Sequence, residues 1–188
     1  MTNIAHFFIA IPIDSSLRGM LKSWQSDLQE LLPYKQWTHE MDLHITLKFL
    51  GPVEGVRLTK LKEALYAVED IETFSVDVEK VGAFGNPEKP RVLWAGVSKN
   101  ESINTLQKLV ENIASEHGFQ PERRAYRPHI TLAKKWNSSV ADHSLDTTKN
   151  LFSDKQQFTV DRVVIFQIFP ARSPKYEVIA EYRLKEGD

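Results

Sequence analysis

The sequence predicts an α+β fold of two similar lobes, each an antiparallel sheet with helices on its outer face, related by a pseudo-two-fold axis around a central cleft. Two observations predict this fold. The tetrapeptide His-Ile-Thr-Leu occurs twice, and a succession of strand, helix, motif strand, helix and strand surrounds each copy. Equivalent positions keep nearly the same offset, which is 85 residues from His44 to His129, 85 from Ala10 to Ala95 and 84 from Phe74 to Phe158.

The first half of the chain shows five alternating segments. We expect a strand at 7–13, a helix at 17–32, a motif strand at 43–50, a helix at 56–68 and a strand at 74–78. The strands are short apolar or alternating runs, whereas the helices repeat leucine and other apolar residues at spacings of three and four. Asp14, Ser15 or Ser16 can cap the first helix, and a polar turn separates that helix from the motif strand.

The second half repeats this order. We expect a strand at 92–97, a helix at 103–113, the second motif strand at 128–134, a weak helix at 139–150, and strands at 158–163 and 176–184. Residues 82–90 are rich in glycine, asparagine and proline, so we expect a loop there. The whole chain, 1–188, is predicted to form a single domain that is long enough to bury a core.

The composition excludes several classes of protein. There is no cysteine among the 188 residues, which excludes disulfides, cysteine zinc sites and thiol nucleophiles. The formal net charge of −1 excludes a protein that binds polyanions through overall basicity, although a local basic patch is compatible with it. The sequence has no apolar run of membrane-spanning length and no signal peptide pattern, so we expect a cytoplasmic protein without a membrane partner.

The two motifs place chemistry on one face of two strands. Because strand side chains alternate between faces, His44 shares a face with Thr46, and His129 shares a face with Thr131. If the pseudo-two-fold axis brings the strands together, two imidazoles face one cleft. A neutral and a protonated imidazole suit a general base and a general acid, and the threonine hydroxyls can donate hydrogen bonds to phosphoryl oxygens.

Simpler interpretations compete with this hypothesis. A single histidine on a half-buried strand is more often a solvated surface residue than a catalytic group, and the argument rests on the registered pair. A metal site would combine His44 and His129 with a carboxylate such as Asp42, but no second ligand pair at metal spacing accompanies them. We therefore expect no metal and no other cofactor.

Four segments carry a resemblance to a known family. They are Phe-Ile-Ala-Ile-Pro at 8–12, His-Ile-Thr-Leu-Lys-Phe-Leu-Gly at 44–51, Pro-Arg-Val-Leu-Trp-Ala-Gly-Val at 90–97 and Arg-Pro-His-Ile-Thr-Leu at 127–132. With two H-x-T motifs, one in each lobe, the chain resembles the 2H phosphoesterase superfamily over nearly its whole length. The segments are similar to the branch of bacterial and archaeal RNA 2′,3′-cyclic phosphodiesterases, formerly called 2′-5′ RNA ligases.

The resemblance implies metal-free opening of a 2′,3′-cyclic phosphate at an RNA end, which leaves a 2′-phosphomonoester. It also implies that His44 protonates the departing 3′ oxygen and that His129 activates water. The chain departs from the family pattern at Lys134, where the family often has arginine five residues after the second histidine. Lysine is a point charge rather than a bidentate fork, so Lys134 is expected to hold the phosphate more loosely, or together with Lys135 or Arg127.

Further candidates for binding RNA lie close to the motifs. Phe49 follows the first motif on its strand and is the best candidate for stacking on a terminal base, ahead of Phe8 and Tyr126. Arg127 directly precedes the second motif and is a candidate for contacting a phosphate. For the aromatic residues, packing in the core is the competing interpretation.

Two classes of function follow from the sequence. The first is a cyclic phosphodiesterase that acts on RNA or nucleotide 2′,3′-cyclic phosphate ends, with weak reverse 2′-5′ ligation as a further activity because both directions share a transition state. The second is a non-catalytic module that binds RNA ends or nucleotides in the same cleft. For either class, we expect a monomer whose partner is RNA or a cyclic nucleotide.

Overall fold

The computed structural model describes residues 4–138, 152 and 154–187. Its helices and strands follow one another in the order β1 (His6–Pro12), α1 (Ser15–Leu31), β2 (Tyr34–Trp37), η1 (Glu40–Asp42), β3 (His44–Pro52), α2 (Gly55–Ala64), η2 (Leu65–Asp70), β4 (Phe74–Asn86), β5 (Lys89–Val97), α3 (Glu101–Glu116), β6 (His129–Trp136), β7 (Gln156–Val160), β8 (Arg162–Ile168) and β9 (Tyr176–Arg183). The weak helix expected at 139–150 lies outside the described residues. No helix in the described part of the chain is long and apolar enough to cross a membrane.

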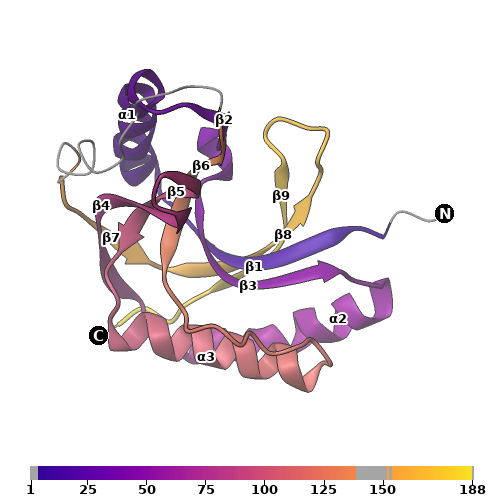
Figure 1. Cartoon of the computed structure of the whole chain (residues 1–188). Coiled ribbons are helices and arrows are strands. Elements are labelled where there is room, and N and C mark those ends of the chain that lie inside the picture. The colour runs from indigo at the N-terminus through magenta and orange to yellow at the C-terminus, as the bar shows by residue number, and fades with distance from the viewer. Residues whose placement is uncertain (1–3, 139–151, 153, 188) are drawn as a thin grey trace.

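The described strands form one twisted sheet in the order β7-β4-β5-β6-β3-β1-β8-β9, with β2 paired to β6. The two motif strands, β3 and β6, are neighbours at its centre, and all strand pairs between named strands are antiparallel. Four strands lie on each side of the β3–β6 junction along this order, and Figure 1 shows the two halves of the sheet diverging from it. The predicted α+β architecture with two similar halves is confirmed.

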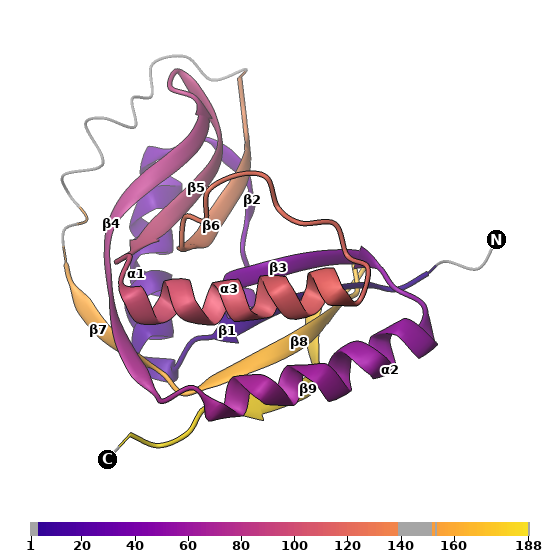
Figure 2. The same cartoon turned by 90° about the horizontal axis from the view of Figure 1, so that it is seen from below.

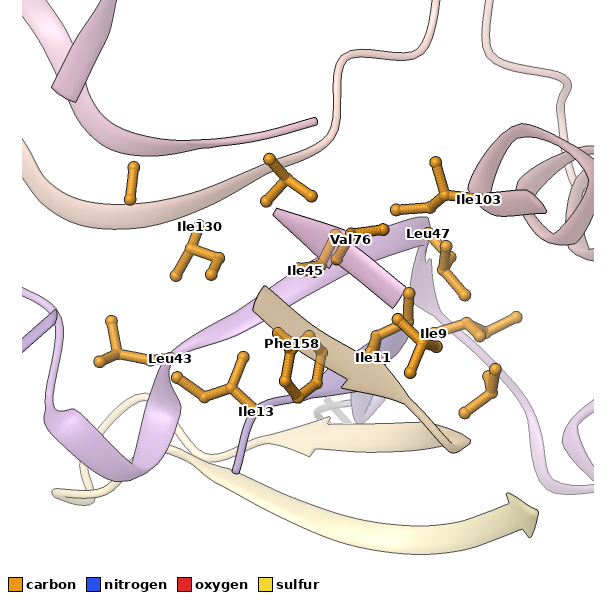
Figure 3. Close-up of a cluster of buried hydrophobic side chains, with 14 of the residues drawn as sticks. Ile9, Ile11, Ile13, Leu43, Ile45, Leu47, Val76, Ile103, Ile130 and Phe158 are labelled. Atoms are coloured by element: carbon orange, nitrogen blue, oxygen red, sulfur yellow. The ribbon is translucent and has the colours of Figure 1, made fainter. Parts of the chain in front are cut away.

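The helices cover one face of this sheet. α2 and α3 lie side by side across the half that contains β1 and β3, and α1 lies against the other half (Figures 1 and 2). The Asp14 carboxylate caps α1 by accepting a hydrogen bond from the Leu17 N–H at 2.7 Å, as the sequence predicts. Buried side chains from all three helices and from both halves of the sheet join in one hydrophobic cluster, part of which Figure 3 shows.

The halves of the sheet differ from the expected lobes in one respect. The third strand expected in each lobe pairs with the opposite half: β4 pairs with β5, and β8 pairs with β1. The strand expected at 158–163 is in fact two strands, β7 and β8, which are separated at Asp161 and belong to different halves. The half with β1, β3, β8 and β9 therefore joins strands from both ends of the chain. The other half takes β4, β5, β6 and β7 from the middle of the chain, together with the short strand β2.

Two local expectations were also wrong. Residues 82–90 form a β-hairpin rather than a loop, since β4 and β5 stay paired up to Asn86 and Lys89. A left-handed φ of 108° at Gly85, next to an irregularity in the pairing, lets glycine and proline remain inside a strand. The polar turn expected before the first motif contains β2, a four-residue strand whose pairing with β6 could not be read from its own pattern.

Candidate active site

The structure brings the two His-Ile-Thr-Leu motifs side by side. β3 and β6 pair antiparallel at Ile45 and Ile130, and both isoleucine side chains are fully buried in the core cluster (Figure 3). Because neighbouring residues on a strand face opposite ways, the histidine and threonine of each motif project from the other face of the sheet. His44 and Thr46 from one half and His129 and Thr131 from the other are therefore placed on one surface, as the sequence predicts.

The two histidines make the same backbone hydrogen bond. His44 Nδ1 lies 2.7 Å from the carbonyl oxygen of Asp42, and His129 Nδ1 lies 2.7 Å from that of Arg127. A carbonyl oxygen can only accept, so Nδ1 carries the proton in each ring and Nε2 is unprotonated in the neutral form. His44 Nε2 lies 3.0 Å from Thr46 Oγ1, which donates to it. Both rings thus keep Nε2 as the atom that can take up or release a proton.

Aromatic side chains surround each imidazole. The His44 ring lies 4.7 Å from Phe8, 5.4 Å from Tyr176 and 5.8 Å from Phe166, measured between ring centroids. The His129 ring lies 4.9 Å from Phe84 in an edge-on arrangement and 6.4 Å from Trp94. These rings remove water from the histidines, which favours their neutral forms.

Burial lowers the pKa of both histidines. Burial, opposed by the hydrogen bond to Asp42 and assisted by the charges of Lys134 and His129, lowers the pKa of His44 to about 4. Burial and then the charge of Lys134 also lower the pKa of His129, against the opposing effect of the Arg127 carbonyl. Both imidazoles are therefore neutral at pH 7 before a substrate binds, and a bound anion would favour returning a proton to one of them.

A bulge in each motif strand directs one more side chain to this surface. Leu47 in β3 and Leu132 in β6 have no paired residue on the adjacent strand, so the alternation shifts by one position after each motif. Phe49 consequently pairs with Phe8, and Lys134 pairs with Val92 on the histidine face. Phe49 is 59% exposed and Lys134 is exposed, and the two stand 85 residues apart at equivalent positions of the two halves.

Lys134 has a second lysine as its neighbour. A small hollow of about 160 Å³ lies between β2, η1 and the β8–β9 loop, and Lys134, Lys175, Asp42 and Tyr176 help to line it. Burial lowers the pKa of Lys134, and the charge of Lys175 lowers it further. A cation that is repelled by another cation gains from an anion placed between them, so the hollow suits a phosphate group.

The remaining predicted residues hold other positions. Phe8 is buried and packs against the His44 imidazole, so its ring has no exposed face on which a base could stack. The Tyr126 hydroxyl donates to the Thr46 carbonyl oxygen at 3.1 Å, which ties the segment before β6 to β3. Arg127 has an exposed side chain, and its carbonyl oxygen accepts the hydrogen bond from His129. Of these three residues, only Arg127 has a side chain exposed for contact with RNA.

Asp42 has a different role from the one considered in the metal hypothesis. Its buried carboxylate accepts hydrogen bonds from the Lys175 N–H at 2.8 and 3.1 Å and from the Tyr176 N–H at 3.1 Å. The same residue offers its carbonyl oxygen to His44, while Tyr176 places its ring against that histidine. Asp42 therefore links the β8–β9 loop to His44. No sequence signal could have found this link, because Lys175 lies 133 residues away in a segment without a motif.

Two imidazoles bound through Nδ1, two threonines and a lysine lie on one face, and these are the groups that a phosphoesterase of the two-histidine class needs. The sequence profile of the 2′-5′ RNA ligase superfamily matches residues 14–168. The chain is 34% identical over 181 residues to an RNA 2′,3′-cyclic phosphodiesterase of Geobacillus stearothermophilus, a match that covers 96% of this chain and 57% of that protein. It is 33% identical to an RNA 2′,3′-cyclic phosphodiesterase of Bacillus subtilis, with 95% of this chain and 96% of that protein covered.

Solved structures show the same fold. The crystal structure of E. coli LigT complexed with 3′-AMP superimposes with a TM-score of 0.79 at 19% sequence identity, covering 97% of this chain and 99% of that one. The chain belongs to the 2′-5′ RNA ligase superfamily. The family resemblance of the four segments is confirmed.

Proposed function

We propose that the protein hydrolyses 2′,3′-cyclic phosphate ends of RNA or of nucleotides to 2′-phosphomonoesters, using His44 and His129 as its acid and base. The observation that carries the proposal is the pair of motifs on β3 and β6, each of which holds an imidazole through its Nδ1 and carries a threonine on the same face. Curated relatives that match 95–96% of the chain bear the name of this activity, which supports the choice of substrate.

The reaction needs two proton transfers. His129 takes a proton from water as the water oxygen attacks phosphorus, and His44 gives a proton to O3′ as the P–O3′ bond breaks. The phosphate then remains on O2′, and the two histidines return to their initial states by exchanging protons with solvent. Because both Nδ1 atoms are held by backbone carbonyls, each Nε2 is fixed in direction for its transfer.

Negative charge that develops on the phosphoryl oxygens needs donors. Thr46 and Thr131 stand beside the histidines, and Thr46 Oγ1 turns from His44 Nε2 to the phosphate when the substrate is bound. Lys134 supplies a positive charge to the same group, with Lys175 across the small hollow. Phe49, exposed on the same face, provides a surface on which the terminal base stacks.

The same groups would also serve 2′-5′ ligation. A 5′-hydroxyl in the place of water would attack the cyclic phosphate and form a 2′-5′ bond, and His129 would then take the proton from the hydroxyl. Hydrolysis is favoured because water is in vast excess, so ligation is a weak side activity. We expect the protein to work as a monomer in the cytoplasm. We also expect it to work without a metal, since the Asp42 carboxylate beside His44 already accepts hydrogen bonds from backbone amides.

Turnover of a 2′,3′-cyclic mononucleotide tests the proposal directly. The pure protein should convert it to the nucleoside 2′-phosphate, as measured by ³¹P NMR or chromatography, and should do so after exhaustive chelation. His44→Ala or His129→Ala should each lower kcat by about 10²–10⁴-fold. His6→Ala, at an exposed histidine on β1, is the matched control and should leave kcat unchanged. Binding without turnover would instead identify a non-catalytic module.

A further inference from the structure

A hollow among the described residues adjoins the His129 side of the site. It is a groove of about 760 Å³ that runs over β4 and β5 and is walled by the segment 125–128. Its lining includes Pro128, the residue directly before His129. Volumes of this size are typical of sites for small ligands and cofactors. Lys80, Gly82, Trp94, Gly96, Lys99 and Arg127 are the lining residues that matter here.

The groove is continuous with the surface of the motifs. Gly96 pairs with His129 and Trp94 pairs with Thr131 across β5 and β6, and directly paired residues face the same side of a sheet. One strand further out, Gly82 pairs with Trp94. Thr131, Trp94 and Gly82 are therefore neighbours on three adjacent strands and face the same side of the sheet. The groove thus lies within a few strand spacings of the reacting phosphate.

Two glycines allow close packing at the floor of the groove. A Cβ at Gly82 would overlap the Trp94 indole, and a Cβ at Gly96 would come within 2.9 Å of the Glu79 carbonyl oxygen. In the other half of the sheet, the positions that correspond to Trp94 and Gly82 are Ala10 and Val164. Both are buried in a second hydrophobic cluster together with Phe8 and Phe166. The two halves are alike in topology but differ here, so a ligand that extends beyond the reacting phosphate has room on the His129 side.

The charge of the groove fits a polyanion. Three cationic side chains, Lys80, Lys99 and Arg127, line it against one carboxylate, Glu79, in a chain whose net charge is −1. Lys80 lies in a bulge of β4 with no residue opposite it on β5, and it has a left-handed φ of 61°, a costly conformation for a lysine. Its Nζ forms a surface ion pair with Glu79 Oε1 at 3.4 Å. The bulge turns this side chain, which is 73% exposed, out of the strand alternation. The half-buried Trp94 indole adds an aromatic surface.

We propose that this groove is a subsite for a second ribonucleotide of RNA, next to the nucleotide that carries the cyclic phosphate. Its phosphodiester contacts Lys80 and Lys99, and its base lies against Trp94. The inference rests on the proposed function and adds that the protein is built for RNA strands rather than for mononucleotides. The second nucleotide belongs to the same strand as the cyclic phosphate or to a separate 5′-hydroxyl strand, and these two sources are chemically alike.

The test compares a 2′,3′-cyclic mononucleotide with a dinucleotide that ends in the same cyclic phosphate. The dinucleotide should have the higher kcat/KM. Lys80→Ala combined with Lys99→Ala should lower kcat/KM for the dinucleotide about tenfold, while kcat/KM for the mononucleotide stays within about twofold of the wild-type value. Lys60→Ala combined with Lys108→Ala, at exposed lysines of α2 and α3, changes the net charge equally and should leave both substrates unaffected.

Two further arms complete the test. A 5′-hydroxyl dinucleotide added to the cyclic mononucleotide detects a separate strand through inhibition or ligation, and calorimetry with 2′-phosphorylated mono- and dinucleotides detects the groove without turnover. A gain from the second nucleotide in any arm, lost in the Lys80/Lys99 variant, supports the subsite. Equal affinity and turnover for both lengths with no effect in trans overturns it, as does an equal loss in the Lys60/Lys108 control. Failure of mononucleotide turnover alone counts against the proposed function and leaves the calorimetric comparison decisive for the groove.

Discussion

His44 and His129 each donate an Nδ1 hydrogen bond to a backbone carbonyl oxygen, yet the proposed reaction needs them in opposite protonation states. A base must be neutral before the reaction and an acid must be protonated. The lowered pKa values of both rings suit the base and not the acid. In the free protein, His44 becomes protonated only as the pH falls toward about 4, so the reactive pair with one proton is scarce at neutral pH.

The pH dependence of kcat/KM follows from these shifts. This parameter reports the pKa values of the free protein, and a lowered pKa moves each limb of the profile toward acid. We therefore expect a bell-shaped kcat/KM whose optimum lies below pH 6.5, the ordinary pKa of histidine. kcat itself should have a higher optimum, because the bound phosphate anion raises both values. Initial rates on a cyclic mononucleotide between pH 4 and 9 measure both, and a kcat/KM optimum above pH 7 would contradict the prediction.

Thr46 and Thr131 carry the hydroxyl groups of the two motifs. Thr46→Val and Thr131→Val keep the shape of each side chain and remove the hydroxyl donor. Each should lower kcat by about one to three orders of magnitude, as expected when a donor to the transition state is lost. Thr105→Val, at an exposed position on α3, serves as the control. If kcat is the same in both motif variants and the wild type, the threonines serve only packing.

At the scale of elements, the bulges explain what the sequence could and could not predict. The tetrapeptide repeat and its constant offset predict which strands carry the site and that they meet. Strict alternation, however, would have placed Lys48 on the histidine face and Phe49 in the core. The structure reverses these positions: Lys48 is buried, with Nζ 2.6 Å from Glu111 Oε1, and Phe49 is exposed. A one-residue bulge leaves no mark in the hydrophobic pattern, because it depends on the pairing of two distant strands.

The walls around His44 were beyond prediction for a related reason. Phe166 and Tyr176 come from β8 and β9, strands that a sequence pattern assigns to the other lobe. Only the crossing of the chain at Asp161 brings them to the first motif. Local patterns define a strand, whereas its neighbours in a sheet depend on the whole topology.

The Asp42 carboxylate links η1 to the β8–β9 loop through the Lys175 and Tyr176 amides. Asp42→Asn keeps the size of the side chain but weakens its bonds to the Lys175 and Tyr176 amides, so the loop and His44 should lose their fixed positions. We expect the free energy of unfolding to fall by about 1–3 kcal/mol and kcat by about ten- to a hundredfold. Asp161→Asn, at an exposed carboxylate, should change neither.

A role in stability alone can be distinguished from positioning. If Asp42 positions His44, the pH profile of kcat should shift in the Asp42→Asn variant, because the environment of the imidazole changes with the loop. A loss of stability with an unaltered pH profile and kcat at a temperature where the variant is folded would show that the carboxylate serves the fold only. Urea unfolding and rate profiles on the same preparation measure both quantities.

At the scale of the whole molecule, each half of the sheet supplies one histidine, and neither half holds a complete site. His44 comes from β3 and His129 from β6, and the strands pair directly only at Ile45 and Ile130. If the two histidines act as one unit, His44→Ala combined with His129→Ala should lower kcat little more than the poorer single variant does. Single-turnover rates measure this. Losses that multiply in the double variant would mean that the two rings act independently.

A substrate with an activated leaving group separates the two roles. A nitrophenolate ion leaves without a proton, so on a nitrophenyl phosphodiester the acid has little to do while the base must still activate water. With His44 as the acid, His44→Ala should lose much less rate on this substrate than on a cyclic nucleotide, and His129→Ala should lose about the same on both. The lowered pKa of His44 makes the test sharp, since an acid that is seldom protonated in the free protein works only when the substrate phosphate raises its pKa. Selective recovery of the His129 variant would reverse the assignment. Equal losses in both variants would mean that neither histidine protonates the leaving group, and the reaction would then need another source for that proton.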